Sequence, residues 1–124
     1  MSNELTIKTS VKGLLGTQKT EFDVTSIVDQ AANGGLDTIY DITDAAAGTQ
    51  VDISSFVSTP GACGFQNIDA TETIQIGIQN GGTFFPLLSL PPGRSDSGAD
   101  LAITTFYAKS SSGTIKLRVF CNEK

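Results

Sequence analysis

The chain has 124 residues, of which 39% are hydrophobic and 17% charged, and its formal net charge is −5. This length suits a single domain, and such a domain buries roughly two-thirds of its unfolded surface. The acidic balance opposes nucleic-acid binding, which needs basic patches, and no apolar run is long enough to span a membrane. We therefore expect one domain over residues 1–124 whose partners are neither nucleic acid nor membrane.

The first four residues, Met1 to Glu4, have neither the basic nor the apolar region of a signal peptide. This predicts that the protein is made and folded in a cytoplasm. Chain ends are often free until a partner orders them, so residues 1–4 are expected to form a flexible N-terminal arm.

Apolar and polar residues alternate with a period of two through the first half of the chain, which is typical of half-buried strands. Glycine and proline interrupt the alternation where turns are needed. The strands that this pattern predicts lie near residues 5–11, 20–24, 39–42 and 51–53 and around Phe65.

One segment of the first half suits a short helix instead. Over residues 25–32, Thr25 or Ser26 can cap the start of a helix, and Gly34 can end it. We expect at most this one helix.

The second half has clearer strands and turns. Ile74, Ile76 and Ile78 alternate with polar residues or glycine, and Asn80-Gly81-Gly82 is a strong hairpin signal because these residues tolerate positive φ. Further strands are predicted over residues 83–90, 101–109 and 115–121, separated by proline, glycine and serine clusters. The whole pattern predicts an all-β fold, a single β-sandwich or jelly-roll-like domain of about seven to eight antiparallel strands.

The two cysteines, Cys63 and Cys121, share the parity of inward-facing residues in their predicted strands. A free cysteine in such a position behaves as a small hydrophobe, so we expect two buried, reduced thiols. The alternative is a disulfide, which would require the protein to reside outside a cell.

Several kinds of chemistry are excluded or disfavoured by the residue inventory. The chain has no histidine, which rules out Ser-His-Asp and Cys-His sites within one subunit, and two cysteines do not suffice for structural zinc. We expect no catalytic residue, no cofactor and no metal, and therefore no enzyme. The carboxylates considered for a glycosidase-type pair and attributed to solubilising loops are Asp52, Asp69, Glu72, Asp96 and Asp100.

Three aspartates lie close together at Asp37, Asp41 and Asp44, a spacing that raises the question of a calcium site. The segment lacks the EF-hand pattern, and bulky residues separate the carboxylates. A strand that carries acids on its outer face is the preferred interpretation.

The segment from Thr83 to Leu90 is apolar on both faces of its predicted strand. A strand of this kind is either covered twice or lies at a subunit interface, and Pro86 places it at an edge or a bulge. The alternative is a bulge that keeps every apolar residue in one core. The candidate subunit interface is therefore Phe84, Phe85, Pro86, Leu87 and Leu88.

Residues 73–93 and 105–117 carry a distinctive succession of strands. One strand ends in glycine, a Phe-x-Pro-Leu strand ends in Pro-Gly, and a Tyr-Ala-Lys strand turns into the last strand. This succession resembles small accessory virion proteins of tailed bacteriophages, of the capsid decoration, cement or head-fibre type.

The resemblance implies a non-enzymatic structural component of a phage particle, a decoration or cement protein that binds and stabilises the capsid. It also implies a homotrimer, with further copies of this chain and the major capsid protein as partners, located in the virion after synthesis in the host cytoplasm. The alternative is a receptor- or carbohydrate-binding module of a phage tail or fibre. That function needs exposed aromatic side chains in a groove, and the absence of tryptophan counts against it.

Overall fold

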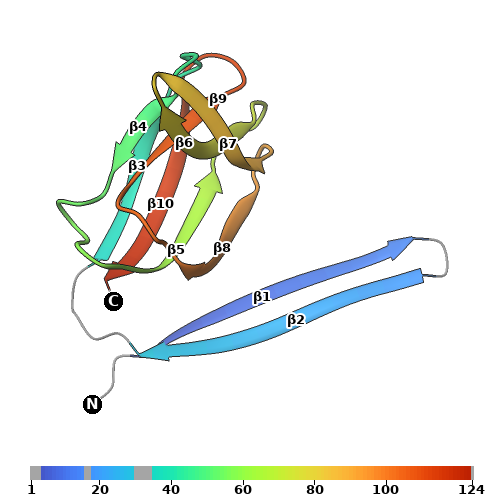
Figure 1. Cartoon of the computed structure of the whole chain (residues 1–124). Helices are drawn as coiled ribbons and strands as arrows, with labels where there is room; N and C mark the ends of the chain where they lie inside the picture. Colours follow the sequence, from blue (N-terminus) through green and yellow to red (C-terminus); the bar gives the residue numbers. More distant parts are fainter. Residues whose placement is uncertain (1–3, 16–17, 30–34, 124) are drawn as a thin grey trace.

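The computed structural model describes residues 4–15, 18–29 and 35–123. Ten antiparallel strands lie within these segments. The first two form a long hairpin outside the two sheets of the others (Figure 1), and the first strand contacts the eighth. The strands are β1 (Glu4–Leu15), β2 (Gln18–Asp29), β3 (Gly35–Ile42), β4 (Thr49–Asp52), β5 (Pro60–Asn67), β6 (Ile74–Asn80), β7 (Thr83–Leu90), β8 (Ser95–Asp100), β9 (Thr105–Ser110) and β10 (Ile115–Glu123).

The remaining eight strands form two four-stranded sheets in the orders β3-β10-β5-β8 and β4-β9-β6-β7. From β3 to β10 each strand crosses to the opposite sheet, apart from the β6–β7 hairpin. This is the strand order of a jelly roll, a double sheet of eight strands. The prediction of an all-β sandwich of jelly-roll type is confirmed.

The helix predicted over residues 25–32 is wrong for its described part, because Thr25 to Asp29 belong to β2. These residues pair with β1, from Thr25 opposite Lys8 to Asp29 opposite Glu4. The segment contains the β-branched residues Thr25, Ile27 and Val28, which favour a strand once a partner strand is present. Residues 30–32 lie outside the described residues.

The structure places the last residue of the expected N-terminal arm in a strand. Glu4 is the first residue of β1 and is opposite Asp29, so it belongs to the hairpin. Residues 1–3 lie outside the described residues.

Across the part of the chain that the structure describes, no helix is long and apolar enough to cross a membrane.

The core lies between the two sheets and follows the alternation of the strands. In β10, Ile115, Leu117, Val119 and Cys121 are buried, whereas the intervening residues are exposed. The buried cluster to which they belong also includes Ile42, Val51, Ile53, Ile74, Phe106 and Ala108. Burying an aliphatic or aromatic side chain contributes roughly 1.5–3 kcal/mol, so this double layer is the main source of stability.

The two cysteines are buried as predicted, but the prediction that they are reduced is wrong. Cys63 in β5 is directly opposite Cys121 in β10, and the structure joins them by a disulfide with a Cα–Cα distance of 4.1 Å. Adjacent antiparallel strands bring directly opposed residues within bridging distance, which residue parity alone does not reveal.

A buried asparagine fixes the loop that connects β5 to β6. The Asn67 side chain is fully buried, and its Nδ2 donates to the carbonyl oxygens of Glu72, at 2.7 Å, and Leu90, at 2.9 Å. Its Oδ1 accepts a hydrogen bond from the Asp69 amide at 3.0 Å. Asn67 therefore joins the loop to the end of β7.

Candidate binding surfaces

β7 is the edge strand of its sheet, and it contains a β-bulge. Ile76 of β6 is opposite Leu88, but the next residue, Gly77, is opposite Pro86. Leu87 is the extra residue of the bulge. A bulge of this kind bends the strand and ends its regular pairing, and Pro86 fits here because it cannot donate to a ladder.

The bulge divides the predicted interface residues into two groups. Phe84 and Leu88 are half-buried, and Leu88 packs against the core. Phe85, Pro86 and Leu87 are exposed, with exposed fractions of 47% for Phe85 and 72% for Leu87. The bulge keeps Leu88 and the buried Leu90 in one core, and the strand also presents apolar side chains at an edge.

We give the name β7 patch to three exposed apolar residues beside the bulge, namely Ile78, Phe85 and Leu87. Ile78 is directly opposite Phe85, so these side chains share a face, and 42% of Ile78 is exposed. No charged residue occurs between Ile74 and Leu90. The centres of protein interfaces are depleted in charged residues in the same way.

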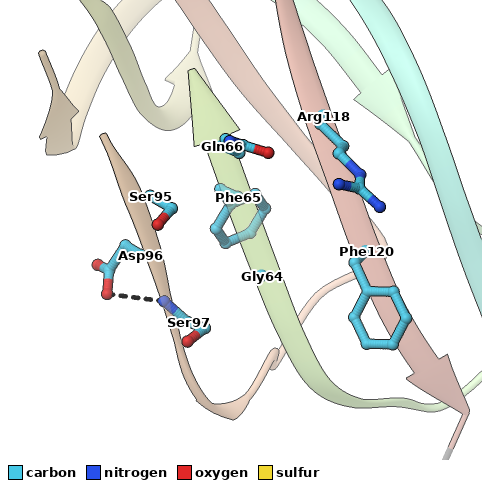
Figure 2. Close-up of a pocket in the computed structure, with 8 residues that line it drawn as sticks. All are labelled: Gly64, Phe65, Gln66, Ser95, Asp96, Ser97, Arg118 and Phe120. Atoms are coloured by element: carbon cyan, nitrogen blue, oxygen red, sulfur yellow. Dashed lines mark hydrogen bonds between the residues drawn. The ribbon is translucent and has the colours of Figure 1, made fainter. Parts of the chain in front are cut away.

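A second surface is a groove on the outer face of the other sheet, across β10, β5 and β8. Figure 2 shows Arg118 and Phe120 along one side, Ser95 and Ser97 along the other, and Gly64 with Gln66 between them. The residues lining this hollow of about 270 Å³ are Gly64, Phe65, Gln66, Ser95, Asp96, Ser97, Arg118 and Phe120.

The one guanidinium of the groove is held by a carboxylate from β3. Arg118 Nε donates to Asp37 Oδ1 at 2.9 Å, and Arg118 Nη2 donates to Asp37 Oδ2 at 2.7 Å. This paired hydrogen bonding lowers the pKa of Asp37 below its usual value and raises the pKa of Arg118. The interaction orients the Arg118 side chain and places a carboxylate directly beside its charge.

The three aspartates considered for calcium bind other partners. Asp37 holds Arg118, Asp41 accepts from Lys116 Nζ at 2.7 Å, and Asp44 accepts from the Gly113 amide at 3.1 Å. Asp37 and Asp41 lie on the outer face of β3, as the strand interpretation predicts. Within residues 4–15, 18–29 and 35–123, no three acidic, cysteine or histidine side chains are grouped to hold a metal ion.

Of the five carboxylates considered for catalysis, Asp96 and Asp100 border one small hollow between β5 and β8, and Glu72 accepts a hydrogen bond from Ser111 Oγ at 2.6 Å. Asp52 accepts from the Ser54 amide, and Asp69 accepts from the amides of Thr71 and Glu72. These bonds lower the pKa of Asp52 and of Asp69 below their usual values. Both side chains therefore stabilise turns.

Phe120 and its groove were not identified from the sequence, although a signal was available. Phe120 has the same parity as Lys116 and Arg118, so alternation already places a large aromatic residue on the solvent face of β10. Its exposed fraction is 40%. The missing information was the strand pairing, which puts Gly64 directly opposite Phe120.

Comparisons with known proteins gave no match, whether to a protein family, to a curated protein or to a solved structure.

Proposed function

We propose that this protein is a non-enzymatic structural component of a tailed-phage particle, a decoration or cement protein that binds the capsid shell. The observation that carries the proposal is the β7 patch, a set of exposed apolar residues in an uncharged stretch at the edge of a sheet. Such a surface suits contact with another protein better than contact with water.

Three further features support the proposal. The sequence of the second half resembles accessory virion proteins, and jelly rolls are frequent among capsid proteins, although a fold alone does not fix a function. The disulfide between Cys63 and Cys121 suits an oxidising medium. A particle released from its host is in such a medium.

The partners in this proposal are further copies of the chain, as a homotrimer, and the major capsid protein. Burying a phenylalanine or leucine side chain contributes roughly 1.5–3 kcal/mol, so Phe85 and Leu87 supply the centre of a contact. A trimer binds through several such contacts at once, and linked contacts strengthen each other through effective concentration.

The test is the occupancy of this chain on phage particles assembled with the natural chain or with Phe85→Ser or Leu87→Ser. Ile103→Ser is the matched control, because Ile103 is 41% exposed but lies outside the β7 patch. We expect both patch variants to reduce occupancy in cryo-electron microscopy and the control to retain it. Full occupancy of both patch variants would refute a contact through this patch, and failure of the natural chain to bind particles would refute the proposed function.

A further inference from the structure

The groove on the outer face of β10, β5 and β8 has a regular construction. Strand pairing forms one row across the three strands from Phe120 through Gly64 to Ser97, and a second row from Arg118 through Gln66 to Ser95. The first row has no side chain at its centre, because Gly64 is a glycine. The result is a hollow between the Phe120 ring and the serines of β8 (Figure 2).

From this construction we infer that the groove is a binding site for one ring of a neutral saccharide. This inference goes beyond the proposed particle contact and does not depend on it, since the groove and the β7 patch lie on different sheets. The hollow of about 270 Å³ is just below the usual size range of small-molecule sites. That size suits a single sugar ring.

The side chains of the two rows match the two kinds of surface on a sugar. Phe120 is 40% exposed and offers an aromatic ring against which the C–H face of a sugar packs. Ser95, Ser97 and Gln66 each carry groups that donate and groups that accept hydrogen bonds. Sugar hydroxyls also do both, so these side chains are suited to several hydroxyl orientations.

The charges among the residues that line the groove itself favour a neutral ligand over an anion. Lys8, Lys12 and Arg94 border an adjoining hollow on β8 that shares Ser95, Asp96 and Ser97 with the groove. Arg118 is already paired with Asp37 through two hydrogen bonds. Asp96 also borders the hollow, where its carboxylate accepts from the Ser97 amide at 2.9 Å. A phosphate or sulfate would therefore meet no uncompensated cation among the residues that line the groove. For the same reason we prefer a sugar to a nucleotide, although both have rings that pack on phenylalanine.

The construction also provides a variant that blocks the groove without disturbing the fold. A Cβ atom on Gly64 would meet Ser97 Cβ at 3.6 Å and the Asp96 carbonyl oxygen at 3.8 Å, which are ordinary contacts. Valine is favoured in strands. Gly64→Val is therefore expected to fill the centre of the groove while the thermal stability stays equal or rises.

The experiment screens the full chain against an array of neutral and acidic glycans and confirms binding by NMR titration with free glucose, galactose, mannose and N-acetylglucosamine. We expect a neutral sugar to shift the amide resonances of β5, β8 and β10. Phe120→Ala is expected to weaken this binding by at least about tenfold, and Gly64→Val to abolish it. The control Ile39→Ala, 52% exposed on the same sheet but outside the groove, should bind like the natural chain.

Three results would overturn the inference. The first is no binding to any neutral sugar. The second is binding that survives both Gly64→Val and Phe120→Ala when their thermal stability matches that of the natural chain. The third is selective binding of acidic glycans or of single-stranded oligonucleotides, since the charge argument excludes both. Occupancy on particles is measured separately, so failure here leaves the proposed capsid contact unaffected.

Discussion

A Cβ atom on Gly77 would lie 2.0 Å from the carbonyl oxygen of Phe85. No side-chain adjustment relieves this overlap, because the atom it meets belongs to the backbone of the neighbouring strand. We predict that Gly77→Ala lowers the free energy of unfolding by about 1–3 kcal/mol or more, the usual range for overpacking. Urea denaturation followed by circular dichroism measures this change.

Gly64→Ala is the control for that measurement, since its nearest contact would be 3.6 Å. It should leave the free energy of unfolding unchanged or slightly higher. Equal stability of the two alanine variants would mean that β7 does not approach β6 as closely as described.

The second prediction concerns the disulfide between Cys63 and Cys121, which are separated by 58 residues in sequence. Cross-links that close loops of this length typically contribute about 2–4 kcal/mol, largely through the unfolded state. The double variant Cys63→Ala, Cys121→Ala should lose about that much stability. Mass spectrometry of the oxidised natural protein should show two hydrogen atoms fewer than after reduction, and thiol labelling of the native oxidised protein would contradict the bond.

The third prediction concerns Asn67. Asn67→Ala removes the donor to the Glu72 and Leu90 carbonyl oxygens and the acceptor of the Asp69 amide. Unpaired buried polar groups cost about 1–3 kcal/mol each, so the loss of stability should be among the largest for any single polar residue here. Gln79→Ala is the control, because the Gln79 side chain donates to the single carbonyl oxygen of Ala47. A smaller loss for Asn67→Ala than for Gln79→Ala would contradict the bonding described.

The fourth prediction concerns the pH dependence of the free energy of unfolding. The amides of Glu72 and Thr71 lower the pKa of Asp69 in the folded protein. A lowered pKa gives stability that is fully present above the unfolded pKa of about 3.9 and is lost as the pH falls through the folded pKa. Asp69→Asn should therefore be less stable than the natural chain at neutral pH, and the difference should shrink in acid. Urea denaturation at a series of pH values tests this, and a difference that grows in acid would reverse the sign.

The fifth prediction separates two neighbours in β7. Leu87 is 72% exposed, so Leu87→Ser should change the free energy of unfolding by less than about 0.5 kcal/mol. Leu88 packs against the core, so Leu88→Ser should cost considerably more. If thermal denaturation shows equal losses, Leu87 is a core residue and the β7 patch is not free to bind a partner.

The sandwich could be predicted from the sequence because the alternation of apolar residues survives in the final fold. In β10 the inward positions Ile115, Leu117 and Val119 are all buried. The β6–β7 hairpin was equally clear, since Gly81 and Gly82 both have positive φ at its turn. Local pattern and local turn chemistry determine these elements.

Features that depend on pairing between distant strands could not be predicted in the same way. The disulfide and the groove both arise because β10 lies beside β5, and neither Cys63 nor Gly64 carries a local sign of that neighbour. The bulge was considered from Pro86 alone, but its position at Leu87 depends on the register with β6. Residues 25–29 were predicted to be helical because they include capping residues. In the fold they form a strand, because β1 provides the hydrogen-bonding partners.

The last strand, β10, lies between β3 and β5, and this position determines when their sheet can form during synthesis on the ribosome. Among the sandwich strands, β3 is hydrogen-bonded to β10 alone, although more than seventy residues separate their first positions. A nascent chain that ends before Ile115 therefore leaves β3 without its hydrogen-bonded partner and one edge of β5 unpaired. Closing a loop of this length is slow compared with forming a hairpin. Completion of the sandwich must follow the emergence of β10 from the exit tunnel.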